Sequence, residues 1–285
     1  MTLDTICTVA VLGAGTMGNG IAHVFARSGY DVILRDVEAA FLDRAMSAIS
    51  KNLDREIKKG KIAEGDKPAI LGRIHATTDF SEIARADFVV EAVPERLDLK
   101  MSVLREADQL LRPEAIVASN TSSISVTTLA AATTRPDRFI GMHFMNPVPV
   151  MELVEVIRAL QTSDDTFRAT MALCERLAKK PVAVNDAPGF VSNRVLMPMI
   201  NEAAFAVMEG VATAEAVDAI LKLGMSHPMG PLELADFIGL DVCVNILDVL
   251  HTGFGDSKYR ACPLLRKMVA AGWLGRKSGR GFYTY

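Results

Sequence analysis

The chain of 285 residues has few cysteines and few aromatic side chains. Its four cysteines are widely spaced, with no C-x-x-C pair, so we expect no disulfide framework, no metal site and a reducing compartment. Only 6% of the chain is aromatic although 50% is hydrophobic, so the apolar mass consists mainly of Ala, Val, Ile, Leu and 14 Met. Such an apolar and nearly neutral composition excludes disorder as the main state.

A long apolar run is also absent. The longest stretch without a charged residue, 115–134, contains nine Ser or Thr residues and Asn120, and is too polar to lie in hydrocarbon. No basic segment precedes the first apolar run at Ile6, so we expect no signal peptide and a cytoplasmic protein. The net charge of -3 does not favour nucleic acid as a partner. Binding to membranes or nucleic acid is therefore not expected.

Short apolar runs alternate with helical patterns in the first two thirds of the chain. Continuous apolar runs are typical of parallel strands that are buried on both faces. They predict strands at 6–12, 31–34, 87–91, 116–119, 139–144 and 182–184, with helices that include 37–60, 96–111 and 164–179. This alternation predicts an α/β fold, a Rossmann-type doubly wound sheet, over residues 1–186.

The pattern changes near 185–189, and no strand is predicted beyond this segment. Helical patterns separated by Gly and Pro follow at 191–209, 214–223, 231–250 and 263–271. We therefore predict a second, smaller, all-α domain over residues 187–285.

The first predicted strand runs into the segment Gly13-Ala14-Gly15-Thr16-Met17-Gly18, which fits the G-x-G-x-x-G fingerprint of dinucleotide-binding sites. A helix is expected from about Gly20, and its N-terminus would supply N–H groups and a positive dipole end for phosphates. Asp36 ends the second strand and is placed to bind the ribose 2′-hydroxyl of the cofactor. The cofactor-binding residues expected here are Gly13, Gly15, Thr16, Met17, Gly18 and Asp36.

The acidic residue also bears on the choice of cofactor. A carboxylate at Asp36 would repel a 2′-phosphate, so NAD is preferred over NADP. The adjacent Arg35 leaves NADP open, because an arginine at this place can accept a 2′-phosphate. FAD also fits the glycine fingerprint taken alone.

Polar residues follow two later strands, at the place where ligands of an open α/β sheet bind. Asn120 and Ser122 follow the strand at 116–119, and His143 lies near the end of the strand at 139–144. A return of the chain would bring Glu155 beside His143, and such a carboxylate fixes the tautomer of an imidazole and makes it a better base. Taken alone, His143 could be a core histidine and Ser122 the cap of the next helix.

Six segments together resemble the L-3-hydroxyacyl-CoA dehydrogenase family, most of all its short bacterial 3-hydroxybutyryl-CoA dehydrogenases. They occur in the family's order and cover nearly the whole chain. The segments are VLGAGTMGNGIA, ASNTSS, GMHFMNPVPVMELVEV, DAPGFVSNRV, HPMGPLELADFIGLD and GRKSGRGFY.

The resemblance implies roles for individual residues. His143 matches the base that takes the proton of a 3-hydroxyl group while hydride leaves C3, and Glu155 matches the carboxylate paired with it. Ser122 and Asn193 match residues that position the substrate oxygen and polarise the thioester carbonyl. The positions that match residues near the NAD are Glu95, Lys100, Asn120, Ser122, Asn146 and Lys277.

A basic cluster follows Asp36 on the long predicted helix. It consists of Lys51, Lys58, Lys59 and Lys61, and lysine is a flexible point charge for the phosphates of coenzyme A. The resemblance places coenzyme A contacts on this helix, so we expect Lys51 and Lys59 to bind substrate with Ser122 and Asn193. A solvated helix face explains any single one of these lysines equally well.

The second domain is very apolar for its size, and large apolar surfaces mark subunit interfaces. The resemblance also implies association through this domain, so we expect a homodimer. The residues that exceed the needs of a single helix face are Ala203, Ala204, Ala206, Val207, Met208, Val244, Ile246, Leu247 and Leu250.

The sequence thus predicts an NAD-dependent enzyme that interconverts (S)-3-hydroxyacyl-CoA and 3-oxoacyl-CoA, with short chains such as 3-hydroxybutyryl-CoA and acetoacetyl-CoA. One alternative is a related dehydrogenase that acts on a free hydroxy acid or polyol, for which the lysine cluster would be unnecessary. Another is an NAD-binding dimer without catalytic activity.

Overall fold

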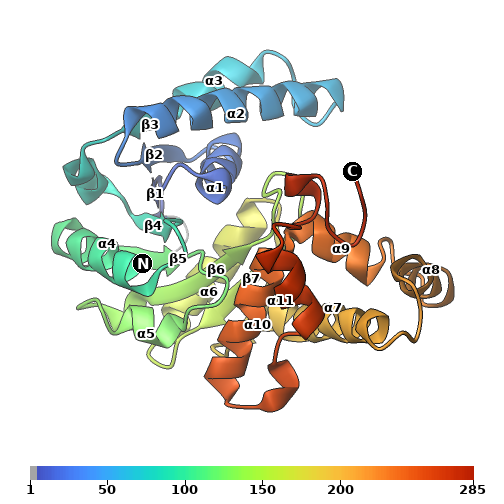
Figure 1. Cartoon of the computed structure of the whole chain (residues 1–285). Helices are drawn as coiled ribbons and strands as arrows, with labels where there is room; N and C mark the ends of the chain where they lie inside the picture. Colours follow the sequence, from blue (N-terminus) through green and yellow to red (C-terminus); the bar gives the residue numbers. More distant parts are fainter. Residues whose placement is uncertain (1–4) are drawn as a thin grey trace. The chain divides into compact units, whose positions relative to one another are not determined.

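The computed structural model describes residues 5–285. Contacts divide the chain into two compact units, one that ends at Asp186 and one that spans Ala187–Tyr285. Figure 1 traces the elements of both units along the sequence. No helix in this described range is both long and apolar enough to cross a membrane.

The described part of the first unit contains an eight-stranded sheet with the order β3-β2-β1-β4-β5-β6-β7-β8. Neighbouring strands run parallel, except that β6 and β7 are antiparallel. The strands are β1 (Thr8–Leu12), β2 (Asp31–Arg35), β3 (Ile74–Thr77), β4 (Phe88–Glu91), β5 (Ile116–Ser119), β6 (Phe139–Phe144), β7 (Leu153–Arg158) and β8 (Lys180–Asn185).

Two strands, β3 and β7, have no counterpart among the predicted strands. β3 lies at the edge of the sheet, and only Ile74 and Thr77 of its four residues are buried, so it forms no continuous apolar run. β7 carries Glu155 within its apolar run. It pairs antiparallel with β6 because a short connection can join only antiparallel neighbours, whereas parallel strands need a long crossover.

Alternate residues of the strands face opposite layers of helices. One face carries residues such as Val9 and Val11 of β1, which share a core cluster with α1, α2 and α6. On the other side, α5 (Val126–Ala130) contacts β6 and β7. Both faces are therefore covered, which explains the continuous apolar runs of the central strands.

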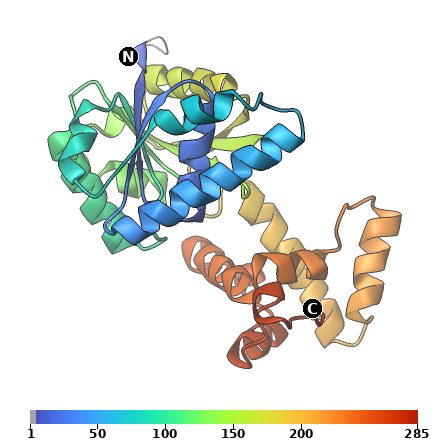
Figure 2. The ribbon, with the colours of Figure 1, turned by 90° about the horizontal axis from the view of Figure 1, so that it is seen from above.

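The helices of the first unit lie close to their predicted positions. The glycine-rich segment leads directly into α1, which begins at Thr16 and not near Gly20. Gly18 and Gly20 lie inside this helix, at positions where its backbone packs closely against neighbouring segments. The long α2 and the short α3 lie side by side (Figures 1 and 2). The remaining bounds are α1 (Thr16–Arg27), α2 (Ala39–Lys58), α3 (Asp66–Gly72), η2 (Phe80–Arg85), α4 (Leu97–Leu110), η3 (Pro136–Arg138) and α6 (Asp164–Arg176).

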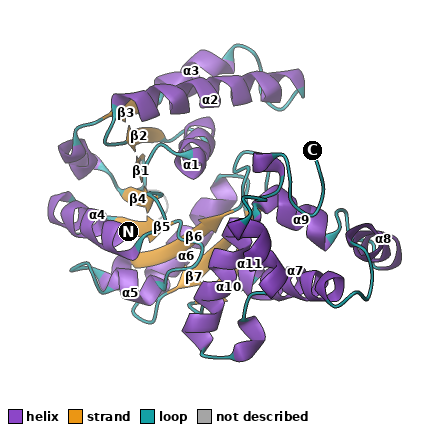
Figure 3. Cartoon of the chain, viewed as in Figure 1, coloured by secondary structure: helices purple, strands orange, loops and turns teal. Residues whose placement is uncertain are grey.

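The second unit is helical, as its predicted fold class requires. Figure 3 shows helices and loops in this part of the chain, and its described residues add only the isolated bridges Gly275↔Arg280 and Arg280↔Thr284. The elements are α7 (Ser192–Met208), α8 (Ala214–Gly224), α9 (Pro231–Ile238), α10 (Leu240–Phe254), η4 (Ser257–Tyr259), α11 (Pro263–Ala270) and η5 (Arg276–Ser278). The predicted single helix over 231–250 is wrong, because Gly239 at φ 107° separates α9 from α10.

Most of the apolar residues that suggested an interface lie in the core of the second unit instead. Ala204, Leu247 and Leu250 are fully buried there, and Ile246 packs against the same cluster. Of that set, only Met208 counts among the exposed large apolar side chains. Other apolar residues, on and beside α8, are exposed and form the candidate surface for association.

The sheet order brings together those predicted site residues that lie at the carboxyl ends of the central strands. From β1 the order continues through β2 and β3 on one side and through β4, β5 and β6 on the other, so the direction in which successive strands are added to the sheet reverses between β3 and β4. The carboxyl ends of these strands meet at one edge, where doubly wound sheets bind their ligands. The predicted fold class, a Rossmann-type sheet domain followed by a smaller all-α domain, is confirmed.

Candidate active site

The glycine-rich turn between β1 and α1 has the shape that a phosphate-binding loop requires. Gly13 has φ 102°, and a Cβ atom there would lie 2.7 Å from the carbonyl oxygen of Ala92. At Gly18 a Cβ atom would lie 1.7 Å from the carbonyl oxygen of Gly13, so helix and turn can pack only with glycine. A Cβ atom at Gly15 would meet nothing within 4 Å. The turn is therefore closed on its inner side and open at Gly15, where α1 begins.

Asp36 lies beside this turn. Its Oδ2 atom accepts a hydrogen bond from the backbone N–H of Ala14 at 2.6 Å, and its Oδ1 atom accepts one from Val37 at 2.7 Å. Each carboxylate oxygen has two lone pairs, so these bonds leave acceptor capacity for a ligand. The neighbouring Arg35 packs its guanidinium over the ring of Phe80, 4.5 Å from the ring centre.

His143 and Glu155 are paired by the register of the sheet. The two residues are direct partners in the antiparallel β6–β7 pair, and antiparallel neighbours on the same face point the same way. The Nδ1 atom of His143 lies 2.8 Å from the Oε2 atom of Glu155, and both side chains are largely buried. The return of the chain that the sequence suggested therefore brings this pair together.

Glu95 accepts several hydrogen bonds from the turn that follows β5. Its Oε1 atom accepts hydrogen bonds from the hydroxyl of Thr121 at 2.6 Å and from the backbone N–H groups of Ser122 and Ser123 at 2.9 and 3.0 Å. Burial raises the pKa of Glu95, but the Lys100 charge and the hydrogen bonds from Thr121 and Ser122 outweigh it, so the pKa lies below its ordinary value. Glu95 is thus held ionised beside Ser122.

Lys100 joins this turn to the end of β4. Its side chain is 1% exposed, and its Nζ atom lies 2.7 Å from Glu91 Oε1 and 3.2 Å from Glu95 Oε2. Asn120 makes a second link, because its Oδ1 atom accepts a hydrogen bond at 2.9 Å from the backbone N–H of Phe144, next to His143. Glu95, Lys100 and Ser122 therefore form one connected cluster, and Asn120 links the end of β5 to the strand that carries His143.

Glu91 is a member of this cluster that the sequence-based predictions left out. It ends an apolar strand of the sequence Phe-Val-Val-Glu. A carboxylate that closes a buried strand at the ligand-binding edge was the available signal. Its side chain is fully buried and bonds Lys100 and the hydroxyl of Ser119.

The remaining predicted site residues lie on other elements. Lys51 lies on α2 and Lys59 directly after it, and both are exposed. Asn146 is exposed in the loop after β6. Asn193 and Lys277 belong to the second unit, where Asn193 is buried near the start of α7 and Lys277 forms an ion pair with Asp241 at 2.5 Å.

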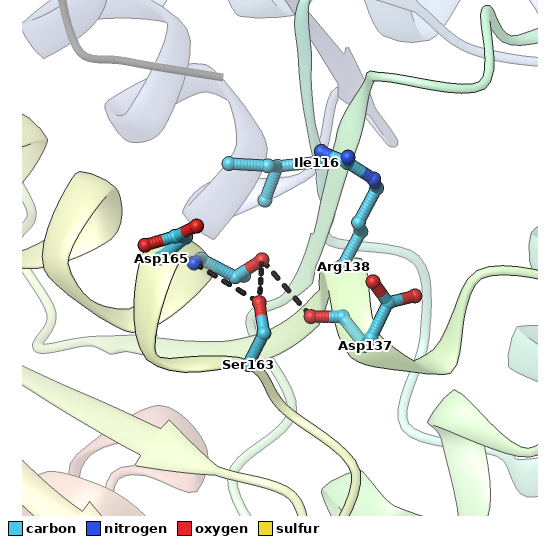
Figure 4. A pocket seen from close by; sticks show the side chains of 6 residues that line it. Ile116, Asp137, Arg138, Ser163 and Asp165 are labelled. Atoms are coloured by element: carbon cyan, nitrogen blue, oxygen red, sulfur yellow. Dashed lines mark hydrogen bonds between the residues drawn. The ribbon is translucent and has the colours of Figure 1, made fainter.

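A hollow of about 140 Å³ lies at the amino-terminal ends of β5 and β6, away from the carboxyl ends that carry the predicted site (Figure 4). It is lined by Ile116 at the start of β5, by Asp137 and Arg138 before β6, and by Ser163 and Asp165 at the start of α6. Hydrogen bonds of Ser163 with Thr166 cap α6 here. Within residues 5–285 no group of three or more His, Cys, Asp or Glu side chains is arranged to hold a metal ion.

Comparisons with known proteins cover nearly the whole chain. Residues 8–187 match the family model described as 3-hydroxyacyl-CoA dehydrogenase, NAD binding domain, and residues 189–285 match 3-hydroxyacyl-CoA dehydrogenase, C-terminal domain. The chain belongs to the 3-hydroxyacyl-CoA dehydrogenase family. The match to the NAD binding domain indicates a nicotinamide cofactor.

Several members of this family are closely similar over their full length. A probable 3-hydroxybutyryl-CoA dehydrogenase of Deinococcus radiodurans is 58% identical over 275 residues, which is 96% of this chain and 99% of that protein. A 3-hydroxybutyryl-CoA dehydrogenase of Bradyrhizobium diazoefficiens is 55% identical over 277 residues, or 97% of this chain and 94% of that protein. The crystal structure of (S)-3-hydroxybutyryl-CoA dehydrogenase from Ralstonia eutropha has a TM-score of 0.96 and 52% identity, and covers 99% of both chains. The resemblance found in the sequence is confirmed, and the chain is an enzyme.

Proposed function

We propose that the protein interconverts (S)-3-hydroxyacyl-CoA and 3-oxoacyl-CoA with NAD, and that its substrates are short-chain thioesters such as 3-hydroxybutyryl-CoA and acetoacetyl-CoA. The observation that carries this proposal is the pairing of His143 with Glu155 at 2.8 Å, at the sheet edge that also carries the glycine-rich turn. A histidine oriented by a carboxylate is suited to move the proton of a hydroxyl group.

Each site residue has its own role in the proposed reaction. Bound NAD supplies the acceptor for the hydride that leaves C3 of the hydroxyacyl group. Because Glu155 engages Nδ1 of His143, the imidazole would take the hydroxyl proton at Nε2, and the carboxylate would stabilise the imidazolium that results. Ser122 and Asn193 would bind the substrate oxygen and polarise the thioester carbonyl.

The first unit fits a dinucleotide at the glycine-rich turn. A phosphate can approach the backbone at Gly15, because the space in front of it is open and the first turn of α1 has N–H groups without partners inside the helix. The nicotinamide half would lie near Glu95, Lys100 and Asn120. Asp36 favours NAD over NADP, since Arg35 is turned onto Phe80 and the carboxylate faces the turn.

The two units would then have different tasks. We assign residues 1–186 to NAD binding, with Lys51 and Lys59 of the exposed α2 face as contacts for coenzyme A phosphates. Residues 187–285 supply Asn193 and Lys277 to the site and form the homodimer. Exposed apolar residues of the second unit, including Val211, Ile220 and Leu223, support association with a second copy.

The test is a steady-state assay of the purified protein with acetoacetyl-CoA, longer 3-oxoacyl-CoA esters and free acetoacetate, each with NADH and with NADPH. We expect the highest kcat/KM with acetoacetyl-CoA and NADH. His143→Ala should lower kcat by roughly 10²–10⁴-fold, the usual contribution of a general acid or base.

Other results would contradict the proposal in distinct ways. Equal rates with acetoacetyl-CoA and free acetoacetate would favour a dehydrogenase of free acids. A wild-type protein that binds NADH but turns over neither substrate would favour a dimer without catalytic activity. Unchanged turnover in His143→Ala would remove His143 from the mechanism.

A further inference from the structure

We propose that Glu91 is a positioning residue for the reaction, and that its buried carboxylate sets the place of Ser122 through Lys100 and Glu95. The side chain of Glu91 binds Ser119, Val93 and Lys100, so its effect on the substrate would pass through these neighbours. The proposal therefore rests on the proposed role of Ser122 in the function above. It is carried by a chain of three links, each made of short contacts between described residues.

The first link is the set of hydrogen bonds that holds the Glu91 carboxylate in place. Its side chain is fully buried, and its Oε2 atom accepts a hydrogen bond from the hydroxyl of Ser119 at 2.6 Å. Its Oε1 atom accepts one from the backbone N–H of Val93 at 2.7 Å, and this same oxygen accepts from Lys100. Both oxygens are thus bound to the ends of two neighbouring strands, so the carboxylate has no freedom to rotate.

The second link is Lys100, which enters the site from α4. Its three ammonium protons meet three oxygens, those of Glu91 at 2.7 Å, the carbonyl of Val93 at 3.1 Å and Glu95 at 3.2 Å. The contact with Glu91 is the shortest, and Glu91 is also the buried member of the two carboxylates. Glu91 therefore determines where the ammonium lies, and Glu95 takes up its position relative to that charge.

The third link runs from Glu95 to Ser122. One oxygen of Glu95 receives the backbone N–H groups of Ser122 and Ser123 and the hydroxyls of Thr121, Ser122 and Ser123, at distances from 2.6 to 3.3 Å. The side chain of Glu95 is about one third exposed, so it is less confined than the fully buried Glu91. Its remaining oxygen depends on Lys100 for a fixed position.

The charges explain why a second carboxylate is present. Lys100 and Glu95 would already form a neutral pair, and adding a fully buried anion carries a desolvation cost. In this proposal the group is retained because it fixes a geometry, the position of an ammonium between two carboxylates. Without the charge of Glu91, Lys100 is drawn toward Glu95 alone, and the turn from Thr121 to Ser123 moves with it.

The experiment is a double-mutant cycle on kcat with acetoacetyl-CoA and saturating NADH, using Glu91→Gln, Ser122→Ala and the double variant. Glutamine keeps the shape of Glu91 and removes its charge. We expect E91Q to lower kcat roughly 10- to 100-fold, because a displacement of about 1 Å in a positioned group costs up to about 100-fold. In the S122A background the effect of E91Q should fall below about threefold, since residues that act through one another are not additive.

A matched control is Asp108→Asn. Asp108 and Arg135 also form a buried ion pair, and Asp108 lies on the same helix as Lys100, about 12 Å along its axis at about 1.5 Å per residue. D108N should lower thermal stability with kcat unchanged. If E91Q is not recovered folded, E91Q/K100M replaces it in the cycle, because it leaves no buried ammonium without its carboxylate.

Each outcome decides the proposal. Equal effects of E91Q with and without Ser122, a kcat equal to the wild type, or a change confined to KM for NADH would overturn it. A crystal structure of E91Q gives a readout that needs no turnover. There the Glu95 carboxylate leaves the N–H of Ser122 if Glu91 positions it, and stays within hydrogen-bond distance if it does not. A wild type without activity would contradict the proposed function and leave this structural readout to decide on Glu91.

Discussion

Single residues at the carboxyl edge of the sheet take their properties from the strands that carry them. His143 and Glu155 are 12 positions apart in the sequence, and the antiparallel register makes them direct neighbours. Asp36 follows the same principle, because the end of β2 places its carboxylate against the N–H of Ala14 in the glycine-rich turn. Its predicted role in cofactor choice can be tested at this scale.

We expect Asp36→Ala to weaken NADH binding more than NADPH binding. Both cofactors lose the support that the carboxylate gives to the turn, but only NADH loses a charged partner for its ribose 2′-hydroxyl. The Kd for NADH, measured by titration of cofactor fluorescence, should rise about 10- to 100-fold, because a hydrogen bond to a charged group contributes about 1.5–3 kcal/mol.

Asp31→Ala is the matched control, since Asp31 is an exposed acid at the opposite end of the same strand. It should leave both Kd values unchanged. Equal weakening of NADH and NADPH in D36A would show that the carboxylate only supports the turn.

At the scale of elements, the loop between β6 and β7 is tied to its surroundings by a buried lysine. The ammonium of Lys179 donates hydrogen bonds to the carbonyl oxygens of Val148 and Met151. Val148 in turn packs closely on α1, because a Cβ atom added at Gly20 would lie 2.8 Å from the Cβ atom of Val148. Burial, reinforced by the charge of Arg27, lowers the pKa of Lys179 to about 8.

This lowered pKa predicts a pH dependence of stability. The unfolded chain keeps Lys179 protonated up to its ordinary value near 10.5, whereas the folded protein releases the proton near pH 8. The unfolded state therefore binds more protons between these values, and the contribution of Lys179 to stability rises with pH. Relative to Lys179→Met, the wild type should gain on the order of 1–3 kcal/mol in free energy of unfolding from pH 8 to 10.

Chemical denaturation at several pH values checks this prediction. Lys180→Met is the control, because Lys180 is exposed and its pair with Glu152 raises its pKa. The difference between the wild type and K180M should not rise over this interval. A difference between the wild type and K179M that stays constant with pH would contradict the assigned cause.

At the scale of the whole molecule, exposed apolar side chains are the basis for the proposed homodimer. Leu223 on α8 is 86% exposed, and Val211, Ile220 and Met225 beside it are more than half exposed. The residues that first suggested an interface are mostly buried in the core of the second unit, so the proposal of a homodimer now depends on this second set.

We expect the wild type to sediment as a dimer and Leu223→Asp to sediment as a monomer at the same concentration. A carboxylate in an apolar interface is costly to bury without a partner. Leu160→Asp is the matched control, because Leu160 is 90% exposed in the first unit and should leave the dimer intact. A monomeric wild type, or dissociation in both variants alike, would contradict association through α8.

Local patterns in the sequence were sufficient to predict most of the fold and part of the candidate site. Continuous apolar runs predicted the central strands because these strands are buried on both faces, and the G-x-G-x-x-G segment predicted the turn because only glycine fits at Gly13 and Gly18. His143 lies near the end of β6 and Ser122 follows β5, which places both toward the carboxyl ends of parallel strands, and the family resemblance implied their roles. These features depend on neighbours in sequence or on a fixed repeat, so the chain alone determines them.

Other features depend on contacts between distant segments, which only the tertiary structure decided. The edge strand β3 has little apolar character of its own and is defined by its pairing with β2. The division of 231–250 into two helices follows from the conformation of Gly239, and the apolar residues assigned to an interface are buried by their own unit. Glu91 became visible as a site residue only when its contacts with Lys100 and Ser119 were known, because a buried charge is recognised by its partners and not by its place in the sequence.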